Sequence, residues 1–82
     1  MLLEELHTNR KVIGAKQVKK AITEGSTIKV YLAVDAEPHV IIPLKELSAQ
    51  LGVQIDNSHT MEELGAICNI EVGAAAVALL HT

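Results

Sequence analysis

The spacing of apolar residues alternates along the chain between the pattern of a helix and that of a strand. A short stretch over residues 11–13 stops at Gly14 and predicts a strand. Apolar residues then recur at i, i+3 and i+4, as in an amphipathic helix that ends at Gly25. Residues 28–34 alternate again, which predicts a strand with one strongly apolar face made of Ile28, Val30, Leu32 and Val34.

The same alternation continues to the C-terminus. The sequence DAEP, residues 35–38, predicts a turn whose proline opens a helix that ends at Gly52. Residues 53–55 alternate as a strand, and Thr60 with Glu63 has the form of a capping box at the start of a helix that ends at Asn69. The run AAAVALL, residues 74–80, predicts a fully buried strand, and its alanines suit a central position in a sheet.

Regular alternation of this kind predicts helices on both faces of a largely parallel or mixed sheet. Leu2, Leu3 and Leu6 recur at helical spacing, so we expect a further short helix at the start. The expected fold is a three-layer α/β/α sandwich with a four-stranded mixed sheet. Because 82 residues suffice for one domain and not for two, residues 1–82 are expected to form a single domain.

Few aromatic and cysteine residues narrow the classes of site that the chain can carry. Tyr31 is the only aromatic residue, which argues against a site built on several stacked rings. The single cysteine, Cys68, excludes an internal disulfide and fits a reducing compartment. There is no signal-peptide pattern and no apolar run of the ~20 residues that a membrane span requires. We therefore expect a cytoplasmic protein without membrane association.

No combination of residues predicts catalysis or a cofactor. The four histidines are scattered, without the spacing of metal ligands. Glu62 and Glu63 are adjacent, so on a helix they point about 100° apart and cannot act as a paired acid and base. Cys68 has no base beside it in the sequence and is expected to be a small buried residue. We expect neither an enzyme nor a small-molecule substrate, metal or cofactor.

Positive charge is concentrated in one segment of an acidic chain. The net charge is −3, yet five of the seven Lys and Arg residues lie within residues 10–20, which contain no acid. Lys16, Lys19 and Lys20 share one helical face, and a solvated face is the simplest interpretation. However, Lys16 and Lys20 repel each other at i, i+4, and cations in a first turn oppose the helix dipole. This arrangement therefore favours binding of a phosphate-rich partner.

Three segments together resemble the kink-turn RNA-binding ribosomal protein family, whose best-known member is the archaeal large-subunit protein "L-seven-Ae". The segments are GAKQVKKAITEGS after the first strand, DAEP after the second, and LGAICNIEVGAAAVALL near the C-terminus. The likeness is greatest to the small bacterial YbxF-type branch, which also has G-x-K-Q and I-E-V-G-A-A-A. It covers nearly the whole chain, with the motifs in the same order and at similar spacings.

The resemblance implies a monomeric RNA-binding protein that recognises kink-turns, which are sharply bent internal loops with tandem sheared G·A pairs and a protruding nucleotide, in ribosomal RNA or a riboswitch. Glu37 is expected to read a base and Ile41 to make an aliphatic contact. The residues expected to enter the major groove are Gly14, Ala15, Lys16, Gln17 and Lys20. The residues expected to pack on the protruding nucleotide are Ile70, Glu71, Val72, Gly73 and Ala74.

The chain departs from the archaeal pattern at two places. Lys16-Gln17 stands where the archaeal members have Asn-Glu. Gln17 therefore replaces a carboxylate that only accepts hydrogen bonds by an amide that both donates and accepts them. Gly73 replaces proline, which is expected to loosen its loop. Two alternatives remain: a protein-interaction module of the same fold that does not bind RNA, and a docking domain of an RNA-modifying enzyme, which the chain length disfavours. The lysine face and the IEVG loop favour RNA, since a protein-binding relative need not keep them.

Overall fold

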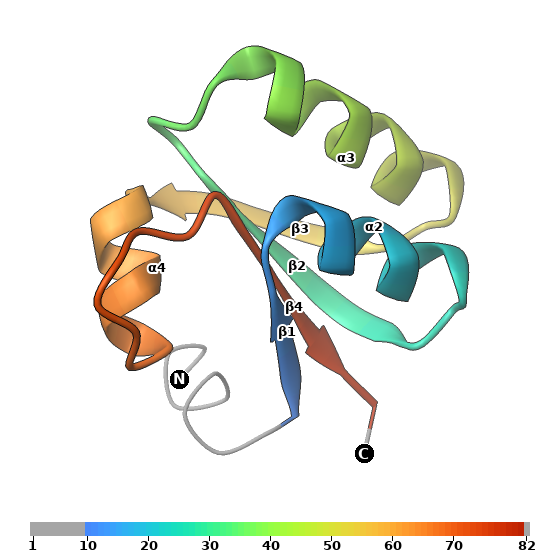
Figure 1. Cartoon of the computed structure of the whole chain (residues 1–82). Coiled ribbons are helices and arrows are strands. Elements are labelled where there is room, and N and C mark those ends of the chain that lie inside the picture. Colours follow the sequence, from blue (N-terminus) through green and yellow to red (C-terminus); the bar gives the residue numbers. More distant parts are fainter. Residues whose placement is uncertain (1–9, 82) are drawn as a thin grey trace.

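The computed structural model describes residues 10–81, in which four strands form one mixed sheet (Figure 1). The strands are β1 (Lys11–Ile13), β2 (Thr27–Ala33), β3 (Gln54–His59) and β4 (Ala76–Leu80). Their order in the sheet is β1-β4-β2-β3, with β2 and β3 parallel and β4 antiparallel to both of its neighbours. The predicted four-stranded mixed sheet is confirmed, and the alanine-rich strand β4 is central in it.

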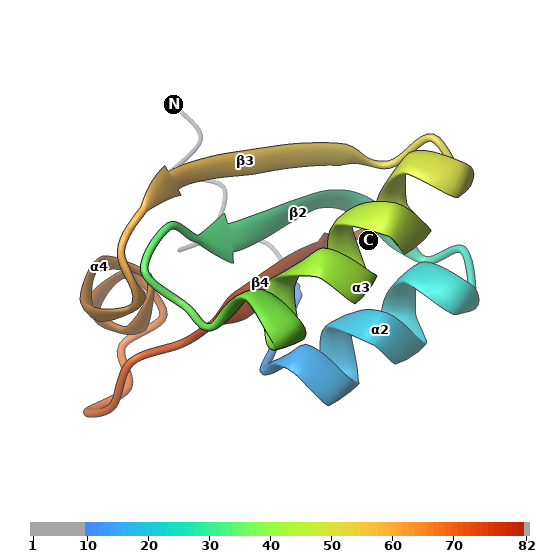
Figure 2. The same ribbon diagram turned by 90° about the horizontal axis from the view of Figure 1, so that it is seen from above.

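Three helices within residues 10–81 complete the layers of the sandwich. They are α2 (Ala15–Thr23), α3 (Pro38–Gln50) and α4 (Met61–Ile67). Helices α2 and α3 lie side by side on one face of the sheet, and α4 lies on the other (Figures 1 and 2). The helix predicted from Leu2, Leu3 and Leu6 lies outside the described residues. Within residues 10–81, no helix is long and apolar enough to cross a membrane.

Each face of the sheet has its own apolar core. Under α2 and α3, Val18 and Ile22 pack with Val30 and Leu32 of β2 and with alanines of β4. Under α4, Leu64 and Cys68 pack with Tyr31, Ala33, Val77 and Leu79. Helix α3 contributes Ile41 and Leu44 to the first of these cores, whereas Leu51, directly after the helix, is exposed.

The prediction that β2 has one apolar face is wrong. Ile28 is 42% exposed and Val34, beyond the end of the strand, is 57% exposed. Tyr31 and Ala33, assigned to the other face, are buried beneath α4. A sheet covered by helices on both sides buries both faces of its central strands, so strict alternation is not expected there. Even Lys29 is buried, with its ammonium group 5.4 Å from the centre of the Tyr31 ring.

All three helices begin at the same end of the sheet. Because β4 is antiparallel to β1 and β2, its N-terminal end lies beside the C-terminal ends of the other strands. Helices α2, α3 and α4 follow β1, β2 and β3 directly, and the segment before β4 returns to the same place (Figure 2). This helix-start end therefore collects three helix N-termini and one loop, whereas Gly25 and Gly52 lie at the opposite end.

Candidate functional site

The N-terminus of α2 lacks a side-chain cap, as that of α3 does, whereas α4 has one. Its N-cap residue is Gly14, no acid occurs in the first turn, and no side chain of residues 10–81 caps the free amides there. Gly14 has φ 106° and ψ 148°, a conformation that is strained for residues with a Cβ. A Cβ there would also lie 2.7 Å from Oε1 of Gln17. The helix therefore starts with bare N–H groups that suit an anion.

The lysine face predicted for this helix is confirmed. Lys16, Lys19 and Lys20 are exposed, whereas Val18 and Ile22 on the opposite side are fully buried. Gln17 is exposed beside them, and Gly14 and Ala15 are half-buried.

The other two cations of the basic segment do not join this face. Arg10 lies at the opposite end of β1, where its carbonyl oxygen accepts a hydrogen bond of 2.9 Å from the Leu80 N–H. Lys11 pairs with Leu79 and therefore lies on the α4 side of the sheet. Only three of the five clustered charges therefore share one surface patch, because strand β1 places Arg10 and Lys11 away from the lysines of α2.

Glu37 lies at the N-terminus of α3, the next helix along the same face of the sheet. It is the N-cap residue, its side chain is exposed, and Pro38 opens the helix as predicted. Ile41 is only 8% exposed and packs in the core under α2 and α3, so it offers little surface to a ligand. Its neighbour Ile42 is 51% exposed.

The loop between α4 and β4 presents apolar surface at the helix-start end. Val72 is 71% exposed, Glu71 and Gly73 are exposed, Ile70 is half-buried, and Ala74 is buried. Gly73 lies against α4, where a Cβ on it would be 3.1 Å from the Cβ of Met61.

The α2 N-terminus and this loop are joined through the sheet. The Gly14 N–H donates a 2.9 Å hydrogen bond to the Ala76 carbonyl, and Ala74 precedes Ala76 by two residues. Two extended residues span about 7 Å, so the end of the loop lies within about 10 Å of Gly14. Both segments that the sequence singled out therefore lie at the helix-start end, with the buried end of the loop near Gly14.

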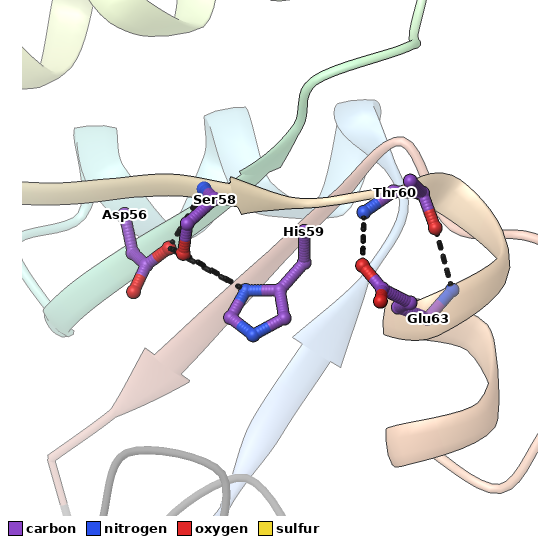
Figure 3. A network of polar contacts seen from close by, with 5 residues as sticks. All are labelled: Asp56, Ser58, His59, Thr60 and Glu63. Carbon is purple, nitrogen blue, oxygen red and sulfur yellow. Dashed lines mark hydrogen bonds and ion pairs between the residues drawn. The ribbon is translucent and has the colours of Figure 1, made fainter.

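Helix α4, beside the loop, is capped by its own side chains. The Thr60 hydroxyl accepts a 3.1 Å hydrogen bond from the Glu63 N–H, and the Glu63 carboxylate accepts one of 2.8 Å from the Thr60 N–H (Figure 3). This confirms the predicted capping box. Its C-terminus follows the prediction too, since Asn69 adopts a left-handed conformation with φ 62°.

Sequence reasoning missed two residues near the loop. The Asp35 carboxylate accepts a 2.8 Å hydrogen bond from the Met61 N–H at the start of α4. Gly65, inside α4, has no room for a Cβ, which would overlap the carbonyl oxygen of Val72. The signal for Gly65 was a glycine in a helix interior, where it costs about 0.5–1 kcal/mol relative to alanine. Nothing local distinguished Asp35, because its partner lies 26 residues away.

Carboxylates surround the hollow between α4, the loop and Asp35. The hollow has a volume of about 460 Å³, and its lining includes Asp35, Glu62 and Glu71. Among residues 10–81, no group of three or more acids, histidines and cysteines is placed to hold a metal ion. Negative charge on this side contrasts with the lysines of α2.

A serine, a histidine and an aspartate at the end of β3 have the residue types of a catalytic triad but not its geometry. The Ser58 hydroxyl donates a 2.6 Å hydrogen bond to Asp56, so its proton points to the carboxylate, while Nδ1 of His59 lies 3.3 Å from the hydroxyl (Figure 3). Burial opposes ionisation of Asp56, but hydrogen bonds from Ser58 and the charges of His59 and Lys29 outweigh it and lower the Asp56 pKa.

Cys68 is also unsuited to nucleophilic chemistry. Its side chain is buried under the sheet, as expected, and the loss of solvent raises the pKa of the thiol, only partly offset by Lys11. A neutral buried thiol acts as a small apolar residue.

The arrangement of helices on both faces of one mixed sheet also occurs in other solved structures. A likeness in fold exists to the 15.5kD RNA binding protein of Giardia lamblia, with a TM-score of 0.91, 22% identity, and coverage of 99% of this chain and 72% of that one. Residues 2–82 match the model of the Ribosomal protein L7Ae/L30e/S12e/Gadd45 family, and the chain belongs to that family. This confirms the resemblance inferred from the sequence.

Several curated relatives are similar along most of their length. An RNA-binding protein of Caldanaerobacter subterraneus is 45% identical over 69 residues, which are 84% of each chain. The RNA-binding protein YbxF of Geobacillus stearothermophilus is 37% identical over 93% of each chain. The large ribosomal subunit protein eL8 of Halobacterium salinarum is 35% identical, over 82% of this chain and 57% of that protein.

Proposed function

We propose that this protein binds RNA, and that it recognises a kink-turn with three segments of the helix-start end acting as one surface. These segments are the tip of α2, the turn of residues 35–38 (the Glu37 turn) and the loop of residues 70–74. The observation that carries the proposal is the hydrogen bond from the Gly14 N–H to the Ala76 carbonyl, because it holds the α2 tip next to the strand that the loop enters. Membership of the family and the RNA-binding names of its relatives support the same function.

The chemistry of the α2 tip suits an opened RNA groove. A regular RNA helix has a major groove too narrow for side chains, but a sharp bend widens it and exposes base edges. Lys16 and Lys20 can donate to phosphate or to guanine O6 and N7, and Gln17 can both donate to a base and accept from one. The lysines therefore contribute affinity, and Gln17 with Glu37 contributes discrimination between bases.

The loop supplies the apolar half of the surface. Val72 and Ile70 can cover a protruding base with aliphatic carbon, which needs no aromatic ring and fits a chain whose one tyrosine is buried. Ile41 acts from beneath, by packing α3 on the core, more than by direct contact. The protein would thus bind one RNA site as a monomer and carry out no catalysis.

A gel-shift comparison of three RNAs tests this function. One RNA contains a kink-turn and the other is a straight duplex of equal length and charge, with a third in which the G·A pairs are replaced by Watson–Crick pairs. We expect tight binding to the kink-turn and weak binding to the other two. Equal weak binding to all three would contradict the proposal and favour a protein-interaction module of the same fold.

A further inference from the structure

Gly65 is required by the packing of the loop against α4. It is buried in the middle of the helix, and an added Cβ would overlap the Val72 carbonyl oxygen and lie 3.2 Å from the Gly73 Cα. These atoms belong to backbone, which cannot move aside as a flexible side chain does. Because glycine is a poor helix former, local preference gives no reason for it here. The reason is that the loop backbone passes so close to the helix at this position that no side chain fits between them.

Met61 connects the same helix to two segments of the proposed RNA surface. Its N–H donates a 2.8 Å hydrogen bond to the Asp35 carboxylate, and its carbonyl accepts one of 3.0 Å from the Ala74 N–H. Asp35 lies two residues before Glu37, and Ala74 ends the loop. One residue of α4 therefore fixes the Glu37 turn and the loop relative to each other.

The charge of α4 itself disfavours contact with RNA. Glu62 and Glu63 occupy its first turn, and Glu62 lines the carboxylate-rich hollow beneath the loop together with Asp35 and Glu71. Phosphates are repelled from such a surface. Val72, on the loop, is the most exposed large apolar residue among residues 10–81. The loop is thus held from behind by α4 and is free to be covered from outside.

We propose that Gly65 and Asp35 are positioning residues for RNA recognition: α4 holds the loop and the Glu37 turn in register with the α2 tip without touching the RNA. This inference rests on the proposed function. It predicts that a change inside α4, far from the lysines, selectively removes the contact of the loop with the protruding nucleotide.

Substitution Gly65→Ala tests this with an RNA-dependent and an RNA-independent measurement. The variant is expected to bind kink-turn RNA about tenfold more weakly than the wild type, as coupled sites typically do. Removing the protruding base, by an abasic nucleotide, should weaken wild-type binding but have little further effect on the variant, because both changes remove one contact. Hydrogen exchange at the Ala74 amide should be faster in the variant without any RNA.

Ala66→Gly is the matched control, since it removes a methyl group from the adjacent exposed position at the edge of the hollow and weakens α4 while leaving the contact between Gly65 and the Val72 carbonyl in place. It should retain both the wild-type affinity and the effect of the abasic nucleotide. If Gly65→Ala also retains both, with unchanged exchange at Ala74, the inference is overturned. A control as weak in binding as Gly65→Ala would overturn it too, because helix stability alone would then explain the loss.

Asp35→Ala extends the test to the other anchor and decides the matter if Gly65→Ala does not fold. It should weaken kink-turn binding by about tenfold, through loss of the anchor that holds the Glu37 turn, while the abasic nucleotide still weakens binding further because Gly65 and the Ala74 hydrogen bond still hold the loop. Wild-type affinity for the kink-turn would refute the positioning role of Asp35. If wild-type protein itself does not distinguish a kink-turn from a duplex, the proposed function fails, and exchange at Ala74 alone decides whether α4 positions the loop.

Discussion

The N-termini of α2 and α4 lie at the same end of the sheet and are built in opposite ways. Helix α4 begins with the Thr60 capping box, has two acids in its first turn and donates the Met61 N–H to Asp35. Helix α2 begins with Gly14, has no side-chain cap and no acid in its first turn, and carries Lys16 there. Three of the four free amides at the start of α4 are satisfied within the protein, whereas no side chain among residues 10–81 caps the start of α2.

The difference has a cost in stability. Glycine in place of a capping side chain costs roughly a few tenths of a kcal/mol, and a cation in the first turn opposes the helix dipole by a further 0.3–1 kcal/mol or so. A chain of 82 residues has a small margin of stability, so such losses are large for it. An anion bound at α2 recovers them, which is the physical case for a functional rather than a structural role of that helix end.

The largest expected effect comes from giving α2 the charge that α4 has. Lys16→Glu should weaken RNA binding by at least about tenfold, because a charge-assisted contact is replaced by repulsion. It should also lower the slope of log K against log salt concentration by about one. The same change should raise the free energy of unfolding by about 0.5–1 kcal/mol, from the helix dipole and a new Glu–Lys pair at i, i+4. Titrations at several salt concentrations and urea unfolding measure the two effects.

Arg10→Glu is the matched control, since it makes the same change of charge at the far end of β1. Its affinity for RNA should remain close to that of the wild type. If Lys16→Glu and Arg10→Glu behave alike, only the net charge of the protein matters, and the contrast between the two helix ends has no functional meaning.

Removing the cap of α4 should have the opposite result. Thr60→Ala is expected to lower the free energy of unfolding by about 1 kcal/mol, whereas Thr60→Ser retains the capping oxygen and most of the stability. RNA affinity of the folded Thr60→Ala protein should fall far less than for Lys16→Glu, because the Asp35 and Gly65 contacts remain. Thermal or urea unfolding measures the loss of stability, and parallel gel shifts measure the RNA affinity. A stable Thr60→Ala protein would mean that the capping box is dispensable.

The C-terminal ends of the two helices offer a smaller comparison. Helix α2 is followed by Gly25 in a left-handed conformation with φ 75°, whereas α4 has Asn69 in that position with φ 62°. Glycine has no Cβ penalty there, so Asn69→Gly should stabilise the protein by about 0.5 kcal/mol, and Gly25→Asn should destabilise it by a similar amount. Urea unfolding of both variants tests the symmetry, which would be refuted by a loss of stability in Asn69→Gly.

The smallest effect concerns pH and the strand that leads into α4. The Asp56 pKa is lower in the folded protein than in the unfolded chain, so its contribution to stability is present above about pH 4 and is lost as pH falls through the folded value. Asp56→Asn should therefore flatten the fall in unfolding free energy on acidification below about pH 4, with no change in shape near neutrality. Urea unfolding at several pH values from about 2.5 to 7 compares the pH dependence of the unfolding free energy in the variant and the wild type. Parallel curves of unfolding free energy against pH for the variant and the wild type would contradict this role of Asp56.

Local patterns predicted the elements of this fold well where each element is set by its own sequence. The capping box at Thr60, the proline that opens α3 and the glycine or asparagine after each helix all act within a few residues. The buried alanine-rich strand was also predictable, because a run of small apolar residues has few other places in a sandwich. Burial on the second face of β2 was not predictable in this way. It depends on α4, which is distant in sequence and packs over Tyr31 only in the tertiary structure.

The candidate site was predictable to the extent that its residues are close in sequence. The lysine face of α2 follows from helical geometry, but Arg10 and Lys11 were grouped with it although the strand carries them elsewhere. Ile41 is buried to a degree that its sequence position does not reveal. Asp35 and Gly65 act through contacts with distant backbone, and the close approach of Val72 to Gly65 depends on how the chain turns after Asn69.

The most direct test of the account is an NMR titration of the labelled protein with kink-turn RNA. Backbone amides of residues 15–17, of the Glu37 turn and of residues 70–73 should shift together and give one dissociation constant, while those of Gly25 and Gly52 at the opposite end stay unchanged. Shifts confined to one of the three segments, or centred on the opposite end, would contradict a single RNA surface at the helix-start end.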